Sequence, residues 1–155
     1  MECARFLSQV AQWIVASEYM KLKSSRTAAE NARVLLPKLA EKYFKSGRTA
    51  ADGKRSPKEL HGFRFKTKQF RYSLELFRPV YGPSLDRRLS SLRGLQGVLG
   101  KLSDYHSVRT MLAGNKTLEA KIERAMKKTL KEFRKQWAAF DSEGQLKRWK
   151  TYLAR

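Results

Sequence analysis

The chain has 155 residues, of which 34 are Lys or Arg and 14 are Asp or Glu, so its formal net charge at neutral pH is +20. Hydrophobic residues make up 41% of the chain, which excludes a disordered basic tail, because such tails lack the apolar surface that offsets chain entropy. We therefore expect one folded domain over residues 1–155 whose surface attracts a polyanion. Cys3 is the only cysteine, which excludes an internal disulfide and indicates a reducing, cytoplasmic location.

Helical periodicity begins near the N-terminus. Residues 4–22 space their apolar side chains for a helix, and the charged and polar residues among them predict neither a secretion signal nor a transmembrane segment. A second helix is predicted over residues 27–45, with Pro37 as a point where it kinks. Residues 45–56 hold two glycines and no apolar periodicity, so we expect a loop there.

Ser56, Pro57 and Glu59 have the spacing of a helix N-cap, a first helical residue and a capping-box carboxylate. A third helix is therefore predicted from residue 57 to about Arg78, a fourth over about 84–112, a fifth over about 117–140 and a short last one from about 145. No segment alternates with a period of two, so we expect no strands. The sequence predicts an all-α antiparallel helical bundle of about five to six helices.

The third helix carries two faces. One is apolar, and we call it the apolar seam: Leu60, Phe63, Thr67, Phe70, Leu74 and Phe77. The other follows the same rhythm one residue later, rotated by about 100°. We call its first four members the cationic stripe: His61, Arg64, Lys68 and Arg71. Its turns recur about every 5 Å, close to the spacing of phosphates in an extended polyanion, and Arg presents a fork suited to phosphate oxygens. A merely solvated face is the alternative interpretation.

Two other helices add candidate features. On the fourth helix, Arg93, Gly97, Gly100 and Asp104 share one edge. Each helical glycine costs about 1 kcal/mol relative to alanine, so we expect another helix to pack closely there. Asp104 is expected either to orient Arg71, Arg64 or His61 across the helix pair or to be an exposed capping or solvated residue. The fifth helix carries a further basic face, which either extends the anionic track or is solvated: Lys121, Arg124, Lys128, Lys131 and Lys135.

The segments "ELHGFRFKTKQFRYSLELFRP" and "LRGLQGVLGKLSDYHSVRTML" resemble the second repeat of the CHAD (conserved histidine α-helical domain) family, over about residues 57–112. The resemblance implies binding of inorganic polyphosphate by a basic channel, with His61, Arg64, Lys68 and Arg71 on one helix and Arg93 on the next. Gln69 and Ser103 depart from the family's usual residues. The family normally has two four-helix repeats, whereas this chain has one copy of the motif, so it corresponds to roughly half a domain. Either the chain is a fragment, or a homodimer rebuilds the channel.

The sequence lacks the usual motifs of an enzyme or a metal site. It has no glycine-rich phosphate loop, no paired carboxylates on the basic helix and too few His and Cys residues for a zinc site, so we expect no catalytic residues, no metal and no cofactor. A nucleic-acid-binding helical protein is the main alternative, because Lys and Arg release counterions from any phosphate backbone. A scaffold on an anionic granule or membrane surface is a third. We expect a cytoplasmic protein associated with polyphosphate granules.

Overall fold

The structure, a computed structural model, describes residues 22–53 and 56–155, and every regular element in those residues is helical. The all-α fold is therefore confirmed, whereas the helix predicted over residues 4–22 lies outside the described residues. The elements are α2 (Ala28–Ala51), α3 (Pro57–Leu76), the short α4 (Arg78–Tyr81), the 3-10 turn η1 (Gly82–Leu85), α5 (Asp86–Met111), α6 (Lys116–Phe140) and α7 (Gln145–Leu153).

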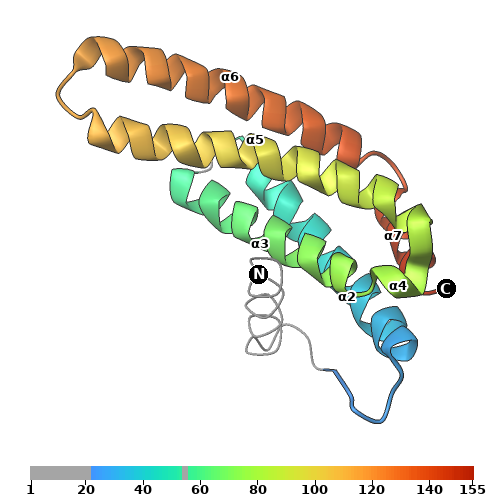
Figure 1. The fold of residues 1–155 in the computed structure, drawn as a ribbon. Coiled ribbons are helices and arrows are strands. Elements are labelled where there is room, and N and C mark those ends of the chain that lie inside the picture. The colour runs from blue at the N-terminus through green and yellow to red at the C-terminus, as the bar shows by residue number, and fades with distance from the viewer. Residues whose placement is uncertain (1–21, 54–55) are drawn as a thin grey trace.

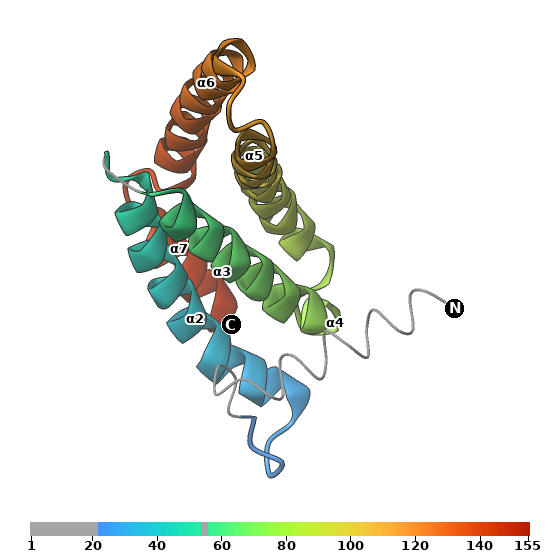
Figure 2. The same cartoon turned by 90° about the vertical axis from the view of Figure 1, so that its left-hand side faces the viewer.

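The long helices run antiparallel to their neighbours in sequence (Figure 1). Helix α3 packs against both α2 and α5, α6 packs along α5, and α7 packs on α2. Figure 2 shows α3 between α2 and α5, with α6 at the top of the view beside α5. The α5–α6 hairpin turns at Gly114, whose φ of 103° is a backbone conformation that suits glycine. This order makes α3 and α5 direct neighbours along most of their length.

Side-chain caps fix where the helices begin. At α3, the Ser56 hydroxyl accepts a hydrogen bond from the backbone N–H of Glu59 (3.3 Å), and the Glu59 carboxylate accepts one from the backbone N–H of Ser56 (2.8 Å). Thr27 and Glu30 form the same capping box at α2. These pairs satisfy N–H groups that the first turn of a helix leaves unpaired. The predicted start of the third helix is confirmed.

The loop predicted over residues 45–56 is wrong in its first half, because α2 continues to Ala51. Gly47 and Ala50 are buried on this last part of α2. The ring of Trp137 on α6 occupies the space that a β-carbon on Gly47 would need. The glycine therefore serves the close approach of two helices and does not mark a turn, which the sequence pattern alone could not distinguish.

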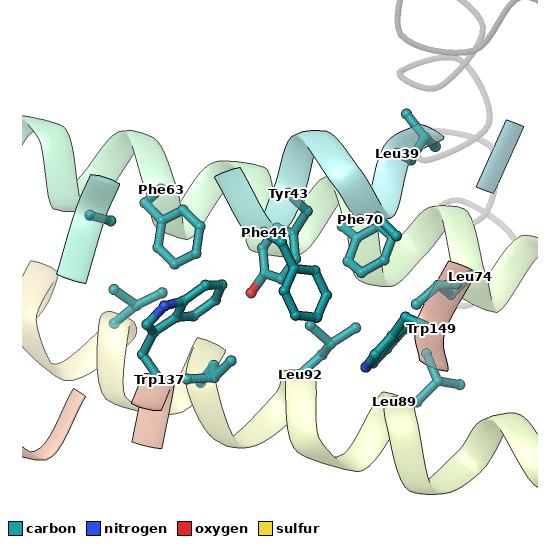
Figure 3. Packing of buried hydrophobic residues seen from close by; sticks show 14 of the residues in the cluster. Leu39, Tyr43, Phe44, Phe63, Phe70, Leu74, Leu89, Leu92, Trp137 and Trp149 are labelled. Carbon is teal, nitrogen blue, oxygen red and sulfur yellow. The ribbon is translucent and has the colours of Figure 1, made fainter. Parts of the chain in front are cut away.

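Aromatic stacking joins α2 to α3 in the core (Figure 3). The ring of Tyr43 stacks on Phe63 and on Phe70, with centroids 5.3 and 4.7 Å away. Thr67 lies between these two positions and donates its hydroxyl to the backbone oxygen of Phe63 (2.9 Å). All six residues of the apolar seam are buried, as predicted. Because this seam faces the core, the neighbouring face of α3, which carries the cationic stripe, is turned toward α5 and the surface.

Candidate anion-binding site

The cationic stripe follows the line where α3 meets α5. At one end, Nδ1 of His61 lies 3.2 Å from the hydroxyl oxygen of Ser103. At the other end, Nε of Arg71 donates to Oε1 of Gln96 (2.9 Å). Residue numbers rise along α3 while those of their partners fall along α5, as the antiparallel arrangement requires. The stripe is therefore a continuous feature of the α3–α5 pair.

Arg64 occupies the middle of this pair. Its Nε is buried and has no hydrogen-bond partner among the described residues. Across from it on α5 lies Gly100, where a β-carbon would lie 3.8 Å from that Nε. A buried donor without an acceptor costs about 1–3 kcal/mol, so leaving this Nε–H unpaired is a costly arrangement in the unliganded protein. An anion that accepts hydrogen bonds from Arg64 would offset part of that cost.

The Arg71 end of the stripe is partly neutralised. Glu75 accepts from Nη1 of Arg71 (2.6 Å) and from Nη2 of Arg93 (3.1 Å), through the same carboxylate oxygen. The side chain of Arg71 is only 13% exposed, and its guanidinium also lies 4.4 Å from the centroid of the Tyr72 ring. Two cations therefore share one carboxylate. In the described residues neither Arg64 nor Lys68 forms an ion pair, so the uncompensated charge lies toward the His61 end.

One expectation about the edge of α5 is corrected, and one alternative for Asp104 is favoured. Asp104 is exposed and forms no ion pair within the described part of the chain, which agrees with its solvated interpretation, and Arg71 is oriented by Gln96 and Glu75. Gly97 is also exposed, and a β-carbon on it would meet nothing within 4 Å, so the close helix packing expected there is wrong. The physical reason is that Gly97 lies on a solvent-facing part of α5, whereas Gly100 lies beside Arg64 of α3.

The lysines predicted on α6 lie on a different surface. Lys128, Lys131 and Lys135 are all exposed. The core-facing residues of α6 are Thr129, Phe133 and Trp137, and a helical step of about 100° per residue places Lys131 and Lys135 nearly opposite Phe133. They point away from the bundle, whereas the cationic stripe borders α5. Their role in binding stays a prediction.

Sequence reasoning missed a cavity of about 180 Å³ at the His61 end of the stripe. Four leucines from three helices line it, and His61 and Ser103 line it together with Arg109, Glu123 and Lys127. Arg109 and Lys127 bring two more cations to this end of the stripe, and Glu123 pairs with Lys127 over 3.4 Å. Only the packing of α6 against α5 brings them there, so no single-helix pattern in the sequence could have found them.

The described residues contain no group of three or more His, Cys, Asp and Glu side chains arranged to hold a metal ion. Among their helices, none has the length and apolar character needed to cross a membrane. What the structure does present is an all-helical bundle with an organised cationic face.

The comparisons with known proteins agree with this class. The family model of the CHAD domain matches residues 1–113, so the chain belongs to the CHAD family. CHAD domains are associated in general with polyphosphate binding. The match includes the whole cationic stripe and Arg93, and it ends just after α5, so the α6 lysines lie beyond it. No curated protein and no solved structure matches the chain. The resemblance is thus confirmed for the family, and the assignment to its second repeat stays a prediction.

Proposed function

We propose that this protein binds inorganic polyphosphate along the line where α3 meets α5. Arg64 and Lys68 supply the uncompensated positive charge, His61 supplies ring nitrogens at the end of the row, and Arg71 and Arg93 supply guanidinium groups already held in place. The observation that carries the proposal is the buried Nε of Arg64, which has no acceptor among the described residues and sits midway in an ordered row of cations. A phosphate chain offers an acceptor at each step of such a row.

The geometry of a helix suits a repeating anion. From His61 to Arg71 the helix axis advances about 15 Å, at about 1.5 Å per residue, so several consecutive phosphates fit along the stripe. Contacts to a linear polyanion release its condensed counterions, which makes binding steeply dependent on salt. Arg71 is fixed by Gln96 and Glu75 before binding, so little side-chain entropy is lost when it meets the anion.

Nucleic acid is the competing polyanion, because its phosphates would meet the same charges. Competition distinguishes the two: long-chain polyphosphate, duplex DNA, RNA and anionic vesicles are titrated separately against the protein at one physiological salt concentration. We expect polyphosphate to bind most tightly. A clear preference for DNA or RNA would contradict the proposal, and a preference for vesicles would favour a scaffold on a membrane surface.

Self-association and location are proposed from the sequence motif. The chain carries one copy of the histidine motif, and we propose that two copies associate to enclose a longer cationic channel, in the cytoplasm and at polyphosphate granules. Sedimentation across a range of protein concentrations tests the association. A strict monomer at the highest concentration, with polyphosphate present and absent, would rule out the dimer and leave the binding proposal intact.

A further inference from the structure

A second cavity lies between α5, α6 and α7, and its volume is about 490 Å³. Its α5 wall includes Arg87, Ser91 and Leu95. At about 100° per residue these positions lie on the side of α5 opposite to Gln96 and Gly100, which face the cationic stripe. The cavity is therefore a separate site from the α3–α5 face, and the family match ends before the α6 and α7 residues that complete it.

Positive charge in this cavity is uncompensated. Arg87 and Arg88 both line it, no Asp or Glu does, and neither arginine forms an ion pair within the described residues. Burial holds the pKa of Arg88 below its usual value; a smaller effect of Tyr152 opposes this, and the nearby positive charges of Arg87 and Arg155 add to the lowering. Two adjacent guanidinium groups that lack a carboxylate form an environment that favours an anion.

The inner part of the cavity is apolar and aromatic. Leu95 and Trp149 are buried there and Phe140 is half-buried, with 5.7 Å between the centroids of the Phe140 and Trp149 rings. Arg88 is held in a fixed orientation, because its guanidinium lies 3.6 Å from the centroid of the Tyr152 ring and 5.5 Å from that of Trp149. A flat apolar group fits such a floor better than a hydrated inorganic ion does.

The rim adds hydrogen-bonding groups that are only partly used. Gln136 donates from its Nε2 to Glu132 (3.2 Å), which leaves its carbonyl oxygen free to accept. Gln145 also lines the cavity, and Ser91 donates its hydroxyl to the backbone oxygen of Arg87, so that hydroxyl can still accept. Amide groups of this kind can pair with the edge of a heterocyclic base.

We propose that this cavity is a binding site for a nucleoside phosphate. The phosphates lie at Arg87 and Arg88, the base lies on the floor formed by Phe140, Trp149 and Leu95, and the Gln136 and Gln145 amides contact its edge. An inorganic phosphate chain would use only the charge at the mouth of the cavity. The inference does not depend on the polyphosphate site, because the two sites share no residue.

Calorimetric titration with ATP and with tripolyphosphate, at one physiological ionic strength, tests the proposal. The full chain used for it carries Arg64→Gln and Lys68→Gln, so that the cationic stripe, which the phosphates of both probes could also meet, is weakened. Both probes carry three linked phosphates and only ATP carries a base. We expect ATP to bind about tenfold or more tightly than tripolyphosphate, as expected for stacking of a base. Equal affinities would overturn the proposal, because they would show that charge alone is recognised.

A pair of matched variants locates the binding. Gly94 is exposed at the cavity and Gly97 is exposed on the stripe side of the same helix, and neither position would place a β-carbon closer than 3.8 Å to another group. We expect Gly94→Leu to lower ATP affinity about tenfold and leave long-chain polyphosphate binding unchanged, while Gly97→Leu leaves ATP binding unchanged. Leucine is the better helix former, so both variants should fold, which circular dichroism checks.

Arg87→Gln provides a second variant that does not depend on filling the cavity. It removes one cation from the mouth, and we expect ATP affinity to fall several-fold or more. The proposal is overturned if ATP binding survives both Gly94→Leu and Arg87→Gln, or if Gly97→Leu weakens ATP binding instead. Loss of polyphosphate binding in Arg64→Gln, with ATP binding intact, would show that the two ligands bind at independent sites.

Discussion

Arg71 on α3 donates a hydrogen bond to Gln96 on α5 over 2.9 Å, and this contact ties the cationic stripe to the neighbouring helix. Glu75 holds the same guanidinium from a second side. The stripe therefore has an ordered end at Arg71 and an uncompensated part at Arg64 and Lys68. This asymmetry determines which substitutions should weaken binding and which should strengthen it.

Arg64→Gln combined with Lys68→Gln should lower polyphosphate affinity by about tenfold to a hundredfold. Each charge-assisted contact contributes about 1.5–3 kcal/mol, and screening by solvent reduces this contribution at partly exposed side chains. The slope of log affinity against log salt should also become shallower. Lys131→Gln with Lys135→Gln removes the same charge from the outer face of α6 and is the control. Equal losses in the two double variants would indicate binding by net charge alone.

Glu75→Gln should strengthen polyphosphate binding several-fold. The change removes a negative charge shared by Arg71 and Arg93, and the Gln carbonyl can still accept their hydrogen bonds, so repulsion of the anion falls by about 0.5–1 kcal/mol. Titrations at two salt concentrations check this. Glu132→Gln on α6 makes the same change in net charge away from the stripe, and weaker binding in Glu75→Gln would mean that its carboxylate is needed to position Arg71.

His61→Gln should weaken polyphosphate binding several-fold, because it removes the ring at one end of the stripe, where Nδ1 lies 3.2 Å from the Ser103 hydroxyl. Calorimetric titration at one pH and one salt concentration measures the change. His106→Gln, which replaces the other histidine, exposed on α5, is the control and should bind as the wild type does. Unchanged affinity in His61→Gln would exclude a contact between that ring and phosphate.

Gly47→Ala should lower the free energy of unfolding by up to about 2 kcal/mol. The added methyl would overlap the buried Trp137 ring, at a cost of about 1–3 kcal/mol, against a gain of about 1 kcal/mol in helix propensity. Gly97→Ala should instead raise stability by about 0.5–1 kcal/mol, because its β-carbon would meet nothing. Denaturant unfolding compares the two, and equal effects would contradict the close approach of α2 and α6.

Tyr81→Phe should destabilise the protein at pH 8 by about 1 kcal/mol, because the Tyr81 hydroxyl donates to the backbone oxygen of Leu153 (2.6 Å). Burial raises the pKa of Tyr81 to about 12, so in the wild type the stabilisation is present below pH 10 and is lost as the pH rises toward 12. The stability gap between wild type and variant should therefore narrow over that range. Thermal unfolding at a series of pH values measures the difference in stability between wild type and variant. A difference that stays constant with pH would contradict the raised pKa of Tyr81.

Much of the fold could be predicted because each helix follows its own local rules. The capping box at Ser56 and the spacing of the apolar seam both depend on neighbours within one helix, and both are confirmed. The end of α2 could not be predicted in this way. Gly47 reads as a helix breaker locally, and only the approach of Trp137, which lies 90 residues later, makes it a packing residue.

The candidate site also combines residues that the sequence of one helix predicts with partners that it does not. The row from His61 to Arg71 follows from helical spacing, whereas its partners Ser103, Gln96 and Glu75 depend on how α3 and α5 align. Asp104 was a reasonable choice of partner by charge, but the alignment places an amide and a nearer carboxylate against Arg71. Arg109 and Lys127 required three helices to be placed together.

The apolar seam and the cationic stripe of α3 share no residue, and the aromatic stack of Tyr43 on Phe63 and Phe70 fixes the rotation of the helix. Folding and the proposed recognition of an anion therefore rest on different side chains of one helix. Outward positions can be exchanged to suit anions of other length or charge density while the core stays as it is, which makes this bundle a ready starting scaffold for engineered polyanion sensors.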